Sequence, residues 1–489
     1  MKKIYTMKKI TGHCFFKHPA AVLFALVFAF EMSIISCATS RPAKLPDSVS
    51  SDASDFAVQE QGGVQQFTLE NGIPVYIKEN HSNRLVSLYV IVRGGTALLK
   101  PEYSGLEMAL MRMMKSGSEK YSYSDLQDLL YRTHADFFGF AQTEGSGLGI
   151  ECLDYYFDDL LMALADGFLH PAFGENEFTT MKKEYSQRLQ STLNDPSSLA
   201  FYTAVKSIYK NHPYETQPSV TLESIDNITI ENMQNLHAKI LDARRISIVV
   251  VGNIKASKIA KKLNTLFSSI PALEDNFILP EVKPVIMGDK NSVLANPSAA
   301  GTGFMIQCFT TPAVTDADYA AACLASDMYS DVLYQVVREE HGACYTPSSA
   351  VLSSKAPFGA VVLYRVSDLE NASSYVREAQ KIMESGKLIA GRNADNSFVF
   401  EQVSGRLESY KNMYINRKYA QMQTNSGVAG RIGGSIFQFG DAVSADAMVE
   451  KARAVTADDI QRVFEKYFVQ GKKQWFCVTG PGDENKIKF

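Results

Sequence analysis

The first folded stretch of the chain alternates apolar and polar positions as β-strands do. Residues 64–69 and 74–78 flank the turn Glu70-Asn71-Gly72, and this arrangement predicts a hairpin. Residues 85–92 are a third strand candidate, which ends at two glycines. Apolar residues at helical spacing then predict helices over residues 104–116, 123–133, 155–169, 175–192 and 229–241. The apolar run 246–252 follows as a buried strand.

One part of this pattern occurs twice. Residues 228–241 and 455–468 both read as helices that begin at a threonine cap, Thr229 and Thr456, with an acidic residue in the first turn. Each helix is followed by an apolar strand that runs into glycine. The copies lie 227 residues apart (455 minus 228), which is too long for a solenoid repeat and has the size of a domain.

The repeat predicts an α+β fold with two homologous lobes. We expect the first lobe over residues 64–270 and the second over residues 291–489. Residues 271–290 contain three prolines and are the expected linker between them.

The chain begins with a segment of a different character. Five lysines precede the apolar run 20–30, as in an export signal, and Ile34-Ile35-Ser36-Cys37 resembles a bacterial lipoprotein box. We therefore expect residues 1–36 to be a lipoprotein signal peptide, Cys37 to be lipidated, and residues 37–63 to be a flexible tether. An uncleaved membrane anchor is the alternative, although the apolar run is shorter than the ~20 residues of a spanning helix.

This N-terminal pattern also predicts where the protein resides. We expect an exported bacterial lipoprotein, anchored to a membrane by its N-terminal lipid, in the periplasm or at the cell surface. Without residues 1–36, 44 basic residues (49 minus 5) face 52 acidic ones (53 minus 1), a net charge of −8. This charge argues against nucleic acid as the partner. The overall composition, 46% hydrophobic and 21% charged, is that of a soluble globular protein.

The cysteines indicate no disulfide framework. Cys14 and Cys37 belong to the signal region, and the other five are scattered, odd in number and without a CxxC spacing. We expect them to be buried free thiols rather than metal ligands. They are Cys152, Cys308, Cys323, Cys344 and Cys477.

Two similar α+β lobes in one chain resemble the insulinase/pitrilysin family, and particularly its short-chain branch that includes mitochondrial processing peptidase and bacterial relatives. The resemblance covers nearly everything after residue 64. It rests on FTLENGIPV at 67–75, on His212-Pro213-Tyr214 before the helix at 229, and on VREEHGACY at 337–345, in that order. It implies that each lobe is a mixed or antiparallel sheet covered by helices.

Active members of this family carry HxxEH on a helix of the first lobe. That spacing places both imidazoles on one helical face towards a tetrahedral zinc, with the glutamate activating water. Here Met108, Met111 and Arg112 occupy those places. A thioether is a poor ligand for hydrolytic Zn²⁺, Met111 cannot accept a proton, and the Arg112 cation opposes a metal. Catalysis by the family mechanism is therefore not expected, and we expect no cofactor in this chain.

Two further positions match the family's third zinc ligand and its neighbour. The family has a glutamate some way downstream of HxxEH, often seven residues after another glutamate, and Glu177 and Glu184 fit. Glu184 lies 72 residues after Arg112 (184 minus 112), and we hypothesise that the two side chains pair where zinc would have been. The alternative is that both are solvated helix carboxylates.

The second lobe departs less from the family. Relatives present an arginine and a tyrosine seven residues apart that reach towards the substrate, and Arg338 and Tyr345 match this pattern. A guanidinium and a phenol are donors suited to holding a carbonyl or a developing oxyanion. The resemblance therefore implies that these two residues bind substrate.

The leading hypothesis is a non-catalytic subunit that pairs with a zinc-bearing homologue, as a heterodimer, and helps it bind extended peptides. Zinc is then expected only in the partner. The alternative is a non-enzymatic binding or assembly scaffold, similar to the core subunits of respiratory complexes. A third reading, a peptidase that uses other ligands, predicts stoichiometric zinc in this chain. The methionine-rich helix has a simpler interpretation as core packing.

Overall fold

A computed structural model describes residues 59–273 and 277–489. The predicted signal peptide and the predicted lipidation site, Cys37, lie outside the described residues. Across the described ranges, none of the helices has both the length and the apolar character needed to cross a membrane.

Seven strands form the sheet of the first half, in the order β1-β2-β3-β7-β4-β6-β5. The predicted hairpin is confirmed, because β2 and β3 pair antiparallel across the turn at Asn71-Gly72. The strand β1 lies before residue 64, where the fold was expected to begin, and pairs with β2. The strands are β1 (Gln59–Gln61), β2 (Val64–Thr68), β3 (Pro74–Glu79), β4 (Leu85–Arg93), β5 (Asp136–Ala141), β6 (Gly145–Leu153) and β7 (Ile246–Gly252).

The predicted helices of the first half are confirmed to within a few residues at their ends. The helices α6 and α8 were not predicted; Asp195 caps α6 and Pro196 occupies the first turn of α6. The helices are α2 (Leu106–Met114), α3 (Tyr123–Thr133), α4 (Phe157–Leu169), α5 (Glu175–Asn194), α6 (Pro196–Ile208), α7 (Ile230–Ile240) and α8 (Ala256–Phe267).

The second half has a five-stranded sheet in the order β10-β11-β9-β14-β8 and a separate two-stranded hairpin, β12-β13. The strands are β8 (Ser292–Ala295), β9 (Gly303–Thr310), β10 (Thr346–Val351), β11 (Phe358–Val366), β12 (Lys387–Arg392), β13 (Phe398–Gln402) and β14 (Lys473–Thr479). The helices are α9 (Tyr319–Leu333), α10 (Ala372–Glu384), α11 (Val403–Gln421), α12 (Asn425–Phe439), α13 (Ala447–Ala454) and α14 (Ala457–Val463).

Strand topology confirms the internal repeat. The order β5-β6-β4-β7-β3 in the first sheet has the same pairing as β10-β11-β9-β14-β8 in the second: three antiparallel pairs, then one parallel pair. The hairpin β12-β13 breaks the symmetry. It lies between α10 and α11, whereas residues 170–174 alone join the corresponding helices α4 and α5.

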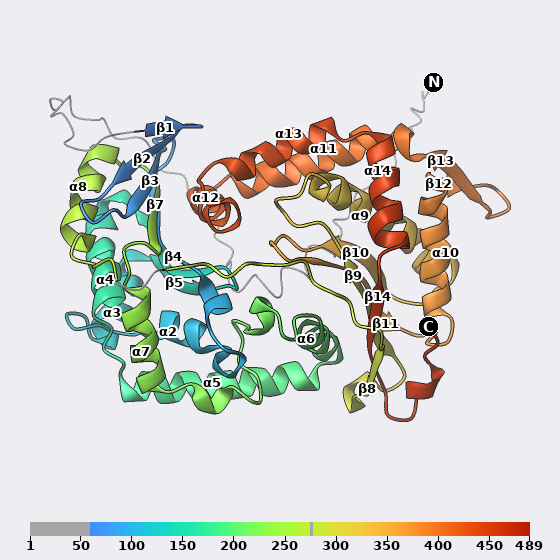
Figure 1. The fold of residues 1–489 in the computed structure, drawn as a ribbon, viewed down its shortest axis with the longest axis horizontal. Coiled ribbons are helices and arrows are strands. Elements are labelled where there is room, and N and C mark those ends of the chain that lie inside the picture. The colour runs from blue at the N-terminus through green and yellow to red at the C-terminus, as the bar shows by residue number, and fades with distance from the viewer. Residues whose placement is uncertain (1–58, 274–276) are drawn as a thin grey trace, which may run out of the picture. The chain divides into compact units, whose positions relative to one another are not determined.

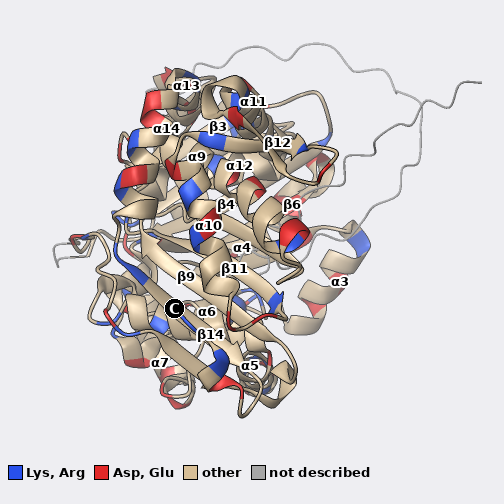
Figure 2. Ribbon diagram, turned by 90° about the vertical axis from the view of Figure 1, so that its right-hand side faces the viewer, with Lys and Arg blue, Asp and Glu red and all other residues tan. Residues whose placement is uncertain are grey.

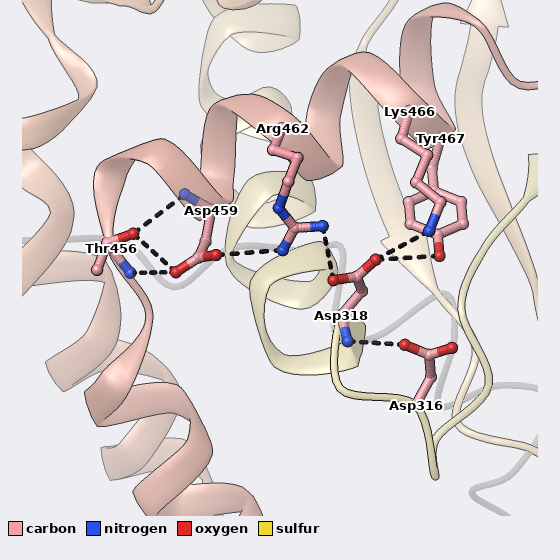
Figure 3. Close-up of polar contacts among 7 residues, drawn as sticks. All are labelled: Asp316, Asp318, Thr456, Asp459, Arg462, Lys466 and Tyr467. Atoms are coloured by element: carbon pink, nitrogen blue, oxygen red, sulfur yellow. Dashed lines mark hydrogen bonds and ion pairs between the residues drawn. The ribbon is translucent and has the colours of Figure 1, made fainter.

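The repeated threonine-capped helix is also confirmed. The Thr229 side chain accepts a hydrogen bond from the amide of Asn232, and Thr456 forms a reciprocal capping box with Asp459. Figure 3 shows this second cap, together with Asp318, which binds Arg462 and Lys466. Asp318 precedes α9, so these ion pairs join the start of α9 to α14 and the turn that follows it.

The two halves exchange helices across their sheets. The helix α12 of the second half packs on β4 and β7, where Ile432, Ile436 and Phe437 join a core with Ile91 and Val249 of the first sheet (Figure 1). In return, α6 of the first half packs on β9 and β14. The helices α6 and α12 occupy equivalent places in the repeat, so each sheet is covered by a helix from the opposite half.

Candidate functional site

The helix α2 carries Met108, Met111 and Arg112, which are predicted to stand in the places of HxxEH. Its backbone lies directly on β5, because a Cβ at Gly139 would stand 2.8 Å from the Met111 carbonyl oxygen. Met111 has no exposed surface, and Met108 is half-buried against the same core. The packing interpretation therefore accounts for these methionines, and both thioethers contribute apolar contacts.

Arg112, at the position predicted for the second zinc-binding histidine, forms an ion pair with Glu184. The distance from Nη2 to Oε2 is 2.6 Å, and the guanidinium also lies 5.9 Å from the centre of the Tyr185 ring. The hypothesised pairing is thus confirmed: a cation on α2 and a carboxylate on α5 meet directly. Glu177, two turns earlier on α5, is half-buried and does not join this pair.

Ser104 and Glu107 have the spacing of a capping box, but no such box forms at the start of α2. The residue that precedes the helix is Gly105, in the left-handed region at φ 84°, and no side chain caps the helix. Ser104 instead accepts a hydrogen bond from the amide of Gln217. Only glycine fits at 105, because a Cβ there would lie 2.4 Å from Cγ1 of Val220.

Glu107 turns into the core instead of capping the helix. It is 1% exposed and accepts a hydrogen bond of 2.5 Å from the Ser146 hydroxyl. Burial raises the pKa of Glu107 to about 6, although the Ser146 hydrogen bond and the charge of the buried Arg245 act in the opposite direction. One of its carboxylate oxygens, Oε2, has no hydrogen-bond partner in the described part of the chain.

The side chains around α2 do not assemble a metal site. Within residues 59–273 and 277–489, no three His, Cys, Asp or Glu side chains are grouped so that they could hold a metal ion. His81, His237 and His341 each hydrogen-bond to a local partner: Asn253 and Glu79, the Phe168 carbonyl, and Glu378. The described cysteines are free thiols, and burial raises the pKa of Cys152 and of Cys344 to about 12.

Arg338 and Tyr345 lie together on the other half of the chain. Arg338 belongs to a π-helical turn, Tyr334–Glu340, that continues α9, and Tyr345 immediately precedes the edge strand β10. Arg338 Nη1 donates to the Tyr345 carbonyl oxygen at 2.9 Å. The guanidinium carbon lies 4.7 Å from the centre of the Tyr345 ring, whose residue is 63% exposed.

Two neighbours of this pair were not foreseen. The guanidinium carbon of Arg338 also lies 4.9 Å from the Tyr334 ring, so two aromatic rings flank the cation. Glu339 Oε1 lies 3.4 Å from Arg338 Nε. The pKa of Tyr334 is raised, first by burial and then by the charge of Glu339. In the sequence, only the spacing of Tyr334, one turn before Arg338, could have indicated that this ring contacts the guanidinium.

The His212-Pro213-Tyr214 motif has a structural role between the halves. His212 Nε2 pairs with the Lys283 carbonyl oxygen in the linker at 2.8 Å, and the Tyr214 hydroxyl donates to Glu144. Glu144 also accepts a hydrogen bond from the amide of Lys355 in the second half and forms an ion pair of 3.5 Å with its ammonium. The motif therefore fastens both the linker and the second half to the first.

In each half of the chain, two of the predicted site residues thus contact each other. Arg112 contacts Glu184, and Arg338 contacts Tyr345. Among the described residues, no hydrogen bond or ion pair joins the first set to the second.

Comparisons with known proteins find two family models along the chain. The model for "Insulinase (Peptidase family M16)" matches residues 74–218, and the model for "Peptidase M16 inactive domain" matches residues 227–385. The "Non-peptidase homolog YmxG" of Helicobacter pylori is 23% identical over 199 residues, which are 41% of this chain and 46% of that protein. The chain therefore spans about half the length of this curated relative.

Two solved structures share the fold. "The crystal structure of a protease from Helicobacter pylori" has a TM-score of 0.74 at 16% identity, over 85% of this chain and 99% of that chain. The "peptidase M16 inactive domain from Pseudomonas fluorescens" has a TM-score of 0.71 at 18% identity, over 85% of this chain and 98% of that chain. At these identities the likeness concerns the fold alone.

Proposed function

Because the chain belongs to the insulinase family of peptidases as an inactive homologue, we propose that it is the peptide-binding subunit of a heteromeric zinc peptidase. In this proposal a zinc-bearing homologous chain supplies the metal and the water, and Arg338 and Tyr345 of this chain hold the peptide. The observation that carries the proposal is the contrast between the two predicted sets. An ion pair between Arg112 and Glu184 occupies the place predicted for zinc. Tyr345, in contrast, is exposed to solvent, and its carbonyl oxygen accepts a hydrogen bond from Arg338.

The strand β10 lies directly after Tyr345 and is the outer strand of its sheet. Part of its edge is occupied within the chain, because the amide and the carbonyl oxygen of Ser349 are both hydrogen-bonded to the Ser330 hydroxyl and Pro347 has no N–H. The support for an extended ligand therefore rests on the donors of Arg338 and Tyr345, which are suited to a peptide carbonyl.

The proposal is tested by co-purifying this chain with an HxxEH-bearing insulinase-family chain of the same organism and measuring cleavage of quenched fluorescent peptides. We expect Arg338→Ala and Tyr345→Phe each to lower kcat/KM of the complex by at least about tenfold, since donors aimed at a reacting carbonyl have effects of that size or larger. Arg453→Ala and Tyr419→Phe, which alter exposed residues elsewhere in the second half, are the matched controls.

Two outcomes contradict this function. If the zinc chain is fully active alone and unaffected by this one, the chain is not its helper. If the two chains assemble but the complex tolerates the loss of both Arg338 and Tyr345, the assembly-scaffold alternative is correct instead.

We also propose that Cys37 is lipidated and anchors the chain after export. The support is the sequence pattern of residues 1–37 alone. Metabolic labelling with a palmitate analogue should mark the full chain and not its Cys37→Ser variant. Equal labelling of both would contradict the anchor.

A further inference from the structure

Two helices of the second half are joined by an ion pair away from the proposed peptide-binding residues. Arg417 of α11 donates from Nη1 and Nη2 to the two carboxylate oxygens of Asp327 on α9, with a distance of 3.2 Å for Nη1. The helices α9 and α11 correspond in the repeat to α2 and α5, which the Arg112–Glu184 pair joins in the first half. The charge of Arg417 is therefore neutralised within the chain.

Lys418, the next residue of α11, has no such counter-ion. Its side chain is half-buried, and its ammonium lies 5.4 Å from the centre of the Tyr414 ring. In the part of the chain that the structure describes, this ammonium takes part in no hydrogen bond or ion pair. Burial lowers the pKa of Lys418; the Cys323 thiol acts in the opposite direction, and the charge of Arg417 lowers the pKa as well. An anion beside this ammonium would stabilise its charged form.

The hydroxyl of Tyr414 is also without a partner. Tyr414 is 5% exposed, and its hydroxyl is buried with no hydrogen-bond partner among the described residues. Burial raises the pKa of Tyr414, so the hydroxyl keeps its proton and remains a donor. A buried donor that lacks an acceptor is unfavourable. Since Tyr414 and Lys418 are one turn apart, one face of α11 carries a donor and a cation that the fold itself does not use.

An open hollow of about 540 Å³ lies along the neighbouring face of α11. It is lined by Ser409, Asn412, Met413, Asn416, Arg417 and Ala420. Its volume is within the range of ligand pockets, and its amide and hydroxyl side chains can donate to and accept from a peptide main chain. Lys418 follows directly after Arg417 and has a flexible stem, so its ammonium can reach a ligand in the hollow.

We propose that Lys418 binds a carboxylate of a peptide that lies in this hollow. The carboxylate, from the C-terminus or from an acidic side chain, supplies the missing counter-ion and an acceptor close to Tyr414. This contact is separate from the Arg338–Tyr345 pair and takes from the proposed function only that the ligand is a peptide. Asp327 and Arg338 lie 11 residues apart (338 minus 327) on α9 and its continuation, about 16 Å along the helix. An extended peptide of about five residues spans that distance.

The experiment measures binding of three unlabelled peptides of equal length to the full chain by isothermal titration calorimetry. One peptide has a free C-terminal carboxylate, the second has a C-terminal amide, and the third has the amide and a central glutamate in place of glutamine. For the wild type we expect at least one carboxylate-bearing peptide to bind at least about tenfold more tightly than the neutral one, as for a hydrogen bond to a charged group. The preferred peptide identifies the source of the carboxylate.

The decisive variant is Lys418→Met, which removes the ammonium and keeps an unbranched side chain. It should bring the three affinities within about twofold of one another, whereas Lys418→Arg should keep the wild-type preference. Tyr414→Phe should weaken the preferred peptide by at least about threefold and leave the neutral one unchanged. Lys451→Met, which removes an exposed lysine of α13, is the matched control and should keep the preference.

Equal binding of the three peptides by the wild type, or none, overturns the carboxylate site, and so does a preference that Lys418→Met retains. A preference that Lys451→Met also loses contradicts it too, because the attraction would then be general rather than local. The proposed function is judged separately by Arg338→Ala. If this variant weakens all three peptides and the wild type shows no preference, peptide binding stands and only this inference fails. If it weakens none while Lys418→Met removes the preference, the carboxylate site stands and the proposed function fails.

Discussion

A carboxyl group buried in the core, such as that of Glu107, couples the stability of the fold to pH. The pKa of this group is raised from 4.5 to about 6 by burial. The folded chain therefore keeps the proton at pH values where the unfolded chain has lost it. The stabilisation is fully present below about pH 4.5 and is lost as the pH rises to about 6, by about 2 kcal/mol in total.

Glu107→Gln should remove this dependence. We expect the free energy of unfolding of the variant, relative to the wild type, to rise by about 2 kcal/mol between pH 4.5 and pH 7.5. Urea denaturation at both pH values measures it. Parallel pH profiles for the two proteins would show that Glu107 titrates normally and that its burial has no energetic consequence.

The same residue shows where single-residue reasoning fails. Ser104 and Glu107 have the spacing of a capping box, but the box does not form. Gly105 adopts a left-handed conformation and lies close to Val220. Val220 lies more than a hundred residues along the chain, so no local pattern could reveal it. By contrast, the Thr229 and Thr456 caps were predictable because their partners are three residues away.

At the scale of elements, α2 and α5 retain the arrangement that a metal site needs. The Arg112–Glu184 contact of 2.6 Å shows that position 112 faces position 184, and position 108 lies one turn before 112. Replacing Met108 and Arg112 by histidine would supply two imidazoles on one helical face opposite a carboxylate. Three protein ligands of this kind are sufficient for Zn²⁺.

We therefore expect the double variant Met108→His/Arg112→His to bind about one Zn²⁺ per chain, measured by elemental analysis after dialysis. Adding Glu184→Ala should weaken zinc binding at least about tenfold, whereas adding Glu177→Ala should have little effect. The buried Met111 is left unchanged, because a glutamate there would place a charge in the core. Failure to bind zinc, with the fold intact, would mean that α2 has turned away from the geometry of active relatives.

Much of the element pattern of the first half was predictable from the sequence. The helices α3 and α5 and the buried strand β7 were located by apolar spacing alone, because each keeps one regular period over its length. The helices α6 and α8, the strands β5 and β6, and most elements of the second half, including the hairpin β12-β13, were missed. The helix α6 packs on a sheet of the other half, and β12-β13 is a local hairpin absent from the matching place in the first half.

The candidate site was predictable to a similar degree. The resemblance to the family singled out Arg338 and Tyr345, but not the ring of Tyr334 or the carboxylate of Glu339 beside them. These depend on a π-helical turn, and the sequence gives no periodic signal for such a turn. In the view of Figure 2, acidic and basic residues are interspersed over the same elements.

At the scale of the whole molecule, stability depends on the helix exchange. The Phe437 ring of α12 lies against Gly145 of the first sheet, where a Cβ would stand 2.1 Å from the ring, and is in edge contact with Phe140. Phe437→Ala should lower the free energy of unfolding by about 3 kcal/mol, since it removes a buried aromatic ring. Phe400→Ala, at a residue that is 46% exposed, is the control and should cost less than about 1 kcal/mol.

Chemical denaturation measures both variants, and hydrogen exchange in β4 and β7 locates the effect. We expect amides of these two strands to lose protection in Phe437→Ala, because α12 covers them. A variant as stable as the wild type would indicate that the contact between α12 and the first sheet is dispensable.

The helix exchange also bears on how the chain is made. During synthesis, the strands that carry Ile91, Val249 and Val251 are made before the helix that covers them. The helix α12 begins a further 174 residues along the chain (425 minus 251). At a synthesis rate of about 5–20 residues per second, this apolar face stays exposed for roughly 10–35 seconds before α12 is made. A nascent chain of this kind is exposed to aggregation for that interval, so its folding yield should depend on elongation rate and on chaperones that hold the first sheet until the second half arrives.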